Sequence, residues 1–261
     1  MLDDLLKSAA LHESIAIPEG WGQGRATYGG LLAAMMCSRL LHVVGEDRIL
    51  RSATVSFVGP VVPGDAELMV EVFRNGKSVT QAETRLRQNG EVMAVLLASF
   101  GATRSTQIMV TPKAVAPVFK APDDCLAMPY IPGVVPEFIQ HVDMRWAEGA
   151  LPFSGVDTPD FGGWMRYRIP LQQMTLTHLF GLIDGWPPAV LPMFTTPAPA
   201  SSMCWTIEFL HFPDDATADT WWQYQVRTDA SAEGYAHTEA HIWDDNGRLV
   251  AISRQTITIF A

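Results

Sequence analysis

Asp184 stands at an unusual place for a carboxylate. Apolar residues at i, i+3, i+4 and i+7 predict a helix over residues 174–185, and they are Leu176, Leu179, Phe180 and Ile183. Gly185 and the following pair Pro187 and Pro188 end this helix. Asp184 therefore lies in the last turn, where the helix dipole disfavours an anion. It is either a carboxylate solvated at an exposed helix end or a reactive carboxylate held there for chemistry.

A single amide lies on the otherwise small or apolar face of the last predicted strand. With period two, that face carries Leu249, Ala251, Ser253, Gln255, Ile257 and Ile259. We expect Gln255 to point inward, where a buried amide needs hydrogen-bond partners. It either bonds to the backbone as a structural residue or holds a water molecule beside Asp184. The aligned position in the first half of the chain is Ala98, so we expect one such site per chain.

A glycine-rich loop over residues 21–30 opens directly into an apolar helix predicted over residues 28–43. The first N–H groups of a helix have no partner within it, so they suit an anion or an oxyanion. Gly29 and Gly30 allow the backbone to approach such a group closely. The loop matches neither a dinucleotide-binding fingerprint nor a P-loop, so a nucleotide motif is excluded.

Composition excludes several classes of protein. The chain has 261 residues, 48% of them hydrophobic, and a formal net charge of −10, which argues against a nucleic-acid partner. Its three cysteines are scattered without CxxC spacing, so we expect reduced thiols and a cytoplasmic location. The N-terminal residues lack the basic start of a secretory signal. No apolar run approaches 18 residues, so we expect no membrane span.

The chain reads as two copies of one α+β unit, each a helix followed by antiparallel strands with Asn-Gly hairpin turns. The best match aligns Gln88-Asn89-Gly90-Glu91-Val92-Met93-Ala94 with Asp245-Asn246-Gly247-Arg248-Leu249-Val250-Ala251. We predict an N-terminal unit over residues 1–103, a proline-rich connector over 104–162 and a C-terminal unit over 163–261. Two such units, each a sheet curled around a helix, would leave sheet edges free. Because free edges can pair with another copy of the chain, we expect a homodimer or higher homo-oligomer.

Four short motifs carry a resemblance to a known family, and they are Tyr28-Gly29-Gly30, Leu182-Ile183-Asp184, Trp205–Pro213 and Ser253-Arg254-Gln255. In order and spacing they resemble the TesB-like acyl-CoA thioesterases, over nearly the whole chain. The resemblance implies a tandem hotdog fold, in which an antiparallel sheet wraps around a long helix in each unit. It also implies an acyl-CoA substrate and hydrolysis of its thioester.

The same resemblance implies a site without a metal or cofactor. In the family an Asp, a Ser or Thr and a Gln position a water, and here these are Asp184, Ser202 or its neighbour Ser201, and Gln255. Tyr28, Gly29 and Gly30 would bind substrate. Counting back from the His-x-Pro motif at His211 puts Met203 at the hydroxyl position, which means either a local shift of the chain or loss of the hydroxyl.

Other groups of residues would suit a metal site or a different enzyme. His237, Glu239 and His241 share one face of a strand and suit either a zinc ion or a solvated polar face. The chain has no GxSxG motif, which argues against an α/β-type serine hydrolase. A pair of His178 with Asp184 would suit a hotdog hydratase or dehydratase, the alternative enzyme. A hotdog protein that binds acyl-CoA without catalysis is the alternative from another class.

Overall fold

The computed structural model describes residues 2–45 and 47–260. Its main feature is one continuous twelve-stranded sheet in which every described strand pair is antiparallel. The N-terminal half contains, in spatial order, β1 (Ser14–Ile17), β5 (Gly64–Asn75), β6 (Val79–Gln88), β7 (Glu91–Gly101) and β4 (Ile49–Phe57). The C-terminal half continues with β11 (Ala200–Phe209), β14 (Leu249–Ile259), β13 (Tyr235–Trp243), β12 (Trp222–Ala232), β10 (Phe161–Tyr167), β9 (Val142–Glu148) and β8 (Leu126–Ala127). A separate small ribbon pairs β2 (Gly22–Gln23) with β3 (Ala26–Thr27).

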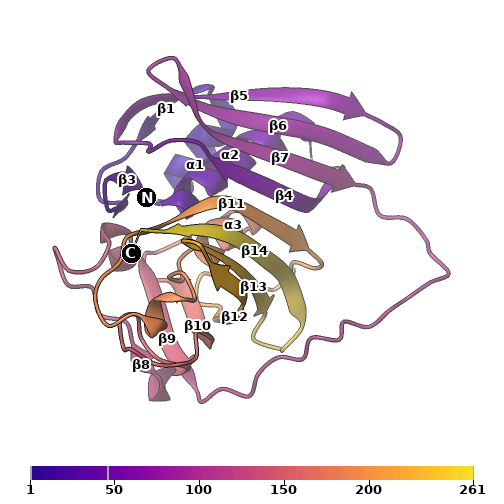
Figure 1. Cartoon of the computed structure of the whole chain (residues 1–261). Helices are drawn as coiled ribbons and strands as arrows, with labels where there is room; N and C mark the ends of the chain where they lie inside the picture. The colour runs from indigo at the N-terminus through magenta and orange to yellow at the C-terminus, as the bar shows by residue number, and fades with distance from the viewer. Residues whose placement is uncertain (1, 46, 261) are drawn as a thin grey trace.

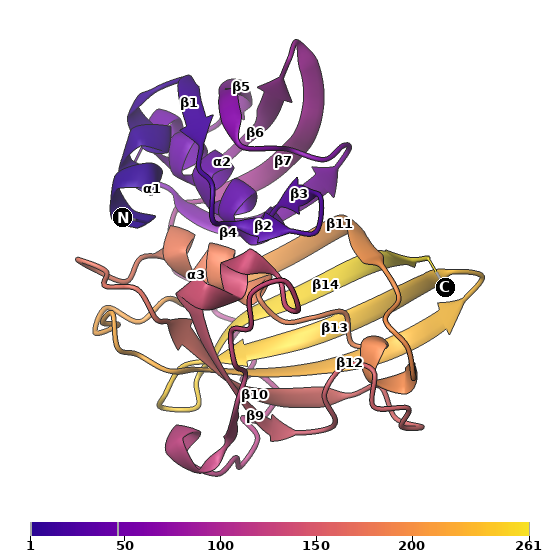
Figure 2. The ribbon, with the colours of Figure 1, turned by 90° about the vertical axis from the view of Figure 1, so that its left-hand side faces the viewer.

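The two halves join through β4 and β11, which pair from Ser52 with Glu208 to Ser56 with Cys204. At the centre of this pairing Thr54 lies opposite Thr206, and their hydroxyl oxygens are 3.1 Å apart. Figures 1 and 2 show the sheet passing from one half to the other at this point. The edge strands of the two halves, β4 and β11, therefore pair with each other within the chain.

The sheet curls around two helices of unequal length. Helix α2 (Gly29–Val44, 16 residues) agrees with the prediction over 28–43. Helix α3 (Leu176–Ile183) lies within the helix predicted over 174–185 but has only 8 residues, so the expected long helix is not confirmed for the second half. It starts late because Thr175 is its N-cap, with a side chain that accepts from the N–H of His178.

The remaining helical elements are short. Helix α1 (Leu2–Leu11) packs against α2, and the 3₁₀ turns are η1 (Pro122–Asp124), η2 (Glu137–His141) and η3 (Leu191–Met193). Residues 102–121 contain no regular secondary structure and arc away from the sheet in Figure 1. None of the helices in the described chain has the length and hydropathy needed to cross a membrane.

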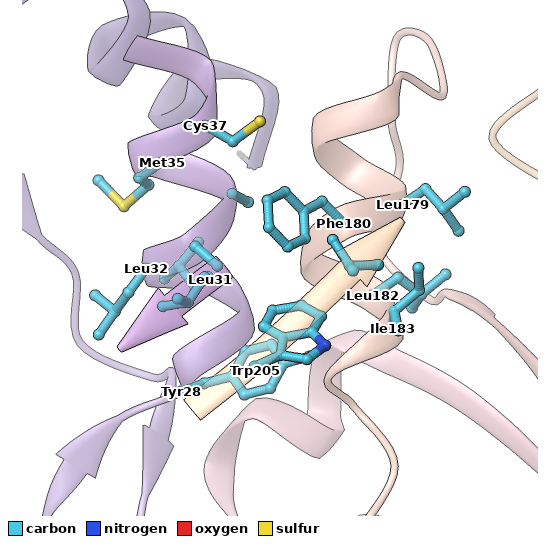
Figure 3. Packing of buried hydrophobic residues seen from close by; sticks show 14 of the residues in the cluster. Tyr28, Leu31, Leu32, Met35, Cys37, Leu179, Phe180, Leu182, Ile183 and Trp205 are labelled. Carbon is cyan, nitrogen blue, oxygen red and sulfur yellow. The ribbon is translucent and has the colours of Figure 1, made fainter. Parts of the chain in front are cut away.

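Helices α2 and α3 pack unusually closely, because glycine faces glycine. A Cβ atom added at Gly30 would lie 2.3 Å from the carbonyl oxygen of Gly181, and one added at Gly181 would lie 3.1 Å from Cβ of Ala34. Trp205 of β11 lies below Phe180 in Figure 3. It is fully buried, and the centroids of the two rings are 4.9 Å apart. This packing brings the N-terminus of α2 against the C-terminus of α3.

Replacing Ser253 by Ala tests this core. The buried Ser253 accepts at 2.8 Å from the indole N–H of Trp205. Its loss leaves a buried donor without a partner, so we expect the free energy of unfolding to fall by about 1–3 kcal/mol in urea titrations. Ser56→Ala, at an exposed position of β4, is the matched control and should change stability by less than about 0.5 kcal/mol. Equal stability of the two variants would contradict the prediction.

Candidate active site

Three side chains form an unbroken chain of hydrogen bonds. The hydroxyl of Ser202 donates to Oε1 of Gln255 at 2.9 Å, and Nε2 of Gln255 donates to Oδ1 of Asp184 at 2.9 Å. The three residues come from β11, β14 and the end of α3, three elements that are far apart in the sequence. The structure thus brings together the three residues expected to position a water.

Gln255 lies where the strand period places it, on the inner face of β14. Both ends of its amide bond to side chains, and one of these is Asp184. The amide is therefore oriented, with its oxygen towards Ser202 and its nitrogen towards the carboxylate. One amide hydrogen is used by Asp184, so a second remains for another acceptor.

A β-bulge explains why the count from His211 reaches Met203 and not Ser202. Ser202 pairs with Ile257 and Cys204 pairs with Thr256, so Met203 is the extra residue of the bulge. Met203 is 45% exposed, and Ser201 is exposed as well. The extra residue accounts for the offset of one position in the sequence count, so the structure shows a local shift with the hydroxyl of Ser202 beside Gln255.

The N-terminus of α2 faces the same carboxylate. A Cβ atom added at Gly29 would lie 3.0 Å from Oδ2 of Asp184, and the backbone N–H of Gly30 hydrogen-bonds to this carboxylate. Asp184 is at the unfavourable end of its own helix but at the favourable end of α2. The N–H of Gly30 thus has the carboxylate as its partner, whereas the N–H of Gly29 has no backbone acceptor among the described residues.

The surroundings of Asp184 favour its protonated form. Burial raises the pKa of the Asp184 carboxyl from 3.8 to about 7, although the hydrogen bonds from Gln255 and Gly30 act in the opposite direction. Asp184, Gln255 and Ser202 each keep part of their surface accessible. A carboxyl with a pKa near neutrality is suited to accept a proton from water.

Sequence reasoning missed two aromatic neighbours of this carboxylate. The ring of Phe57 lies 3.0 Å from the position a Cβ atom would take at Gly29. Tyr224 is close enough for the charge of Asp184 to add to the rise in the Tyr224 pKa that burial causes. Both residues lie on strands whose apolar pattern is that of an ordinary core, so nothing in the sequence distinguished them.

Tyr28 is fully buried, and its hydroxyl donates to the carbonyl oxygen of Gly181 at 2.5 Å. The side chain that was expected to bind substrate thus lies between the two helices. Its neighbours Gly29 and Gly30 lie directly against Asp184.

The pair of His178 with Asp184, which would suit the alternative enzyme, is not formed. Nε2 of His178 lies 3.5 Å from Oδ1 of Asp3 in α1, and Nδ1 lies 2.6 Å from the hydroxyl of Thr175. Six residues along a helix correspond to about 600°, which turns the two side chains to different faces. Burial lowers the pKa of His178, and the charge of Asp3 opposes this.

The three residues considered as zinc ligands have other neighbours. Glu239 pairs with Arg254, and Nε2 of His241 lies 3.8 Å from Glu239. Nδ1 of His237 lies 3.4 Å from the hydroxyl of Thr256. Among the described residues, no three His, Cys, Asp or Glu side chains are grouped so that they could hold a metal ion.

The structure is similar over nearly its whole length to solved hotdog proteins. A conserved protein of unknown function with a hotdog fold from Alicyclobacillus acidocaldarius has a TM-score of 0.86 at 22% identity, and the match covers 100% of this chain and 98% of that one. A putative thioesterase II from Thermobifida fusca YX has a TM-score of 0.80 at 20% identity, with 98% and 97% covered. The acyl-CoA thioesterase II TesB2 from Mycobacterium marinum has a TM-score of 0.72 at 20% identity, with 89% and 88% covered. At these identities the likeness shows the fold, which is a tandem hotdog.

Family models give the more specific assignment. No curated protein matches the chain. The model of the acyl-CoA thioesterase N-terminal domain matches residues 17–101, and the model of the acyl-CoA thioesterase C-terminal domain matches residues 122–259. The two matches follow each other in the order of the two hotdog halves and together cover most of the chain, which therefore belongs to the acyl-CoA thioesterase family and is a thioester hydrolase.

Proposed function

We propose that the protein hydrolyses acyl-CoA to a free acid and CoA, using a water molecule positioned by Asp184, Gln255 and Ser202. The observation that carries the proposal is the hydrogen-bond chain from Ser202 through Gln255 to a carboxyl whose pKa is about 7. A water near the free amide hydrogen of Gln255 and the carboxylate of Asp184 would be both oriented and activated.

In this mechanism Asp184 acts as the general base. As the water oxygen bonds to the thioester carbon, one water proton passes to the carboxylate and negative charge develops on the carbonyl oxygen. In the proposed mechanism the N–H of Gly29, at the positive end of α2, donates to that oxygen and stabilises its charge. The carbon–sulfur bond then breaks, and the proton held by Asp184 passes to the departing CoA thiolate, which regenerates the base.

The role of Gln255 is to orient, because an amide neither gains nor loses a proton in this range. Ser202 in turn fixes the amide, since its hydroxyl donates to Oε1 and leaves the nitrogen side towards Asp184. The expected order of importance is therefore Asp184, then Gln255, then Ser202.

A panel of acyl-CoA thioesters from acetyl to palmitoyl tests the activity. We expect release of free thiol, detected with a thiol reagent, from at least one chain length. Crotonyl-CoA should show no loss of its enoyl absorbance beyond that explained by hydrolysis. Tight binding of acyl-CoA with no thiol released at any chain length would support the non-catalytic alternative, and hydration of the double bond would support the alternative enzyme.

Variants of the three residues test their roles. Asp184→Asn keeps the shape but removes the base, so kcat should fall by roughly 10²–10⁴. Gln255→Ala should lower kcat by about 10–10³, because only orientation is lost, and Ser202→Ala should have the smallest effect. Since Asp184 and Gln255 serve one step, the double variant should lose much less than the product of the single losses.

The matched control for these variants is Asp65→Asn, which changes an exposed carboxylate in β5 and should leave kcat within about twofold. Circular dichroism and thermal melting establish that each variant is folded. Full kcat in a folded Asp184→Asn variant would show that the carboxylate is only a helix end.

The pH dependence tests the protonation state. Because burial raises the pKa of Asp184 to about 7, the base is protonated below that pH and ionised above it. We expect kcat/KM to rise tenfold per pH unit up to a midpoint near 7 and then to level off. A midpoint near 4, or a profile that is flat from pH 5 to 8, would contradict the assignment.

A further inference from the structure

The last turn of α3 departs from a regular helix at one carbonyl. In a regular α-helix the carbonyl of Gly181 would accept from the N–H of Gly185, four residues later. In the structure the N–H of Gly185 instead donates to the carbonyl of Leu182 at 3.0 Å, and the carbonyl of Gly181 accepts from the hydroxyl of Tyr28. The helix therefore tightens and ends at the residue that carries the reactive carboxylate, Asp184.

The side chain of Tyr28 is held rigidly where it makes this contact. Its ring stacks on Phe138 with centroids 4.0 Å apart and planes 8° apart. A Cβ atom added at Gly30 would lie 2.4 Å from the hydroxyl oxygen of Tyr28, so the ring fills the gap that glycine leaves. Burial, and secondly the charge of Asp184, raise the pKa of Tyr28 well above its usual value, so the hydroxyl keeps its proton and donates.

We propose that Tyr28 is a positioning residue for the hydrolysis, and that its hydroxyl ends α3 at Gly181 and thereby fixes Asp184 between Gln255 and the N-terminus of α2. Because Tyr28 immediately precedes α2, one side chain joins the two helix ends that surround the carboxylate. This inference rests on the proposed role of Asp184 as the base.

Removal of the hydroxyl has a definite structural consequence. Without the hydroxyl that holds it, the carbonyl of Gly181 can turn towards the N–H of Gly185, so α3 can gain a residue and turn the side chain of Asp184 away from Gln255. The bond from Gln255 lowers the pKa of Asp184. When this bond weakens, the pKa of Asp184 should rise, and the midpoint of the pH profile should rise with it.

Tyr28→Phe and Tyr167→Phe form a matched pair for the test. Tyr167 is also buried, and its hydroxyl donates at 3.0 Å to the carbonyl of His178 in the same helix. Each variant loses one hydrogen bond to α3, so similar losses of stability are expected. Tyr28→Phe should lower kcat by about 10- to 100-fold, change KM by less than about threefold, and move the midpoint of kcat/KM upward from about 7. Tyr167→Phe should leave kcat within about threefold and the midpoint unchanged.

Two isosteric replacements keep the test valid if Tyr28→Phe does not fold. With p-aminophenylalanine at position 28 a donor is retained, and kcat and the midpoint should stay near those of the natural protein. With p-methylphenylalanine the volume is kept without a donor, and the loss in kcat should return. Full kcat in both proteins would show that volume alone matters, and equal losses in both would show that the donor is not what matters. Either outcome would overturn the proposal.

The outcomes separate the two proposals. If Asp184→Asn is inactive while Tyr28→Phe and Tyr167→Phe behave alike, or if Tyr28→Phe lowers kcat without moving the midpoint, the positioning role is wrong and the proposed base stands. If folded Asp184→Asn keeps full kcat, the base is wrong and the role of Tyr28 is overturned with it.

Discussion

The meeting of two helix ends around one carboxylate is the constraint on which the rest of the site depends. Asp184 sits at the C-terminus of α3, where the backbone carbonyls repel an anion, and against the N-terminus of α2, where the backbone N–H groups attract it. This geometry requires the helices to approach to backbone contact, which is possible only because Gly30 and Gly181 carry no side chains. The core around Trp205 and Phe180 then holds both helices to the sheet.

The unequal helices explain why a repeated fold has this site once. The pairing of β4 with β11 places Thr54 opposite Thr206, so the two halves are related about that pair. Gln255 pairs with Trp205 in one half, and Ala98 pairs with the equivalent Ala53 in the other. The amide is therefore present in the C-terminal half only. This is also the half with the shorter helix, since α3 has 8 residues and α2 has 16.

Local periodicity was enough to predict some features, and long-range contacts decided the others. The helical stripe placed Asp184 in the last turn, and the strand period placed Gln255 on the inner face. Helix α3 is shorter than predicted, because the side chain of Thr175 caps its first turn. The carbonyl of Gly181 near its other end accepts from a tyrosine 153 positions away in the sequence. The place of Ser202 depends on a β-bulge that adds one residue to β11, and the partner of His178 is supplied by α1. None of these contacts leaves a periodic signal.

The burial that suits Asp184 to its proposed role as a base also makes the folded chain less stable near neutral pH. Its folded pKa of about 7 lies above the ordinary value of 3.8, so between these values the folded chain holds a proton that the unfolded chain has released. Stability from this group is therefore greatest at acidic pH, falls as the pH rises through that window, and stays low above about pH 7. Gln255 and Gly30 reduce the cost by bonding to the ionised form. They cannot remove it without lowering the pKa of Asp184 below the range in which a general base works well near neutrality, so the two bonds set a compromise between stability and proton affinity.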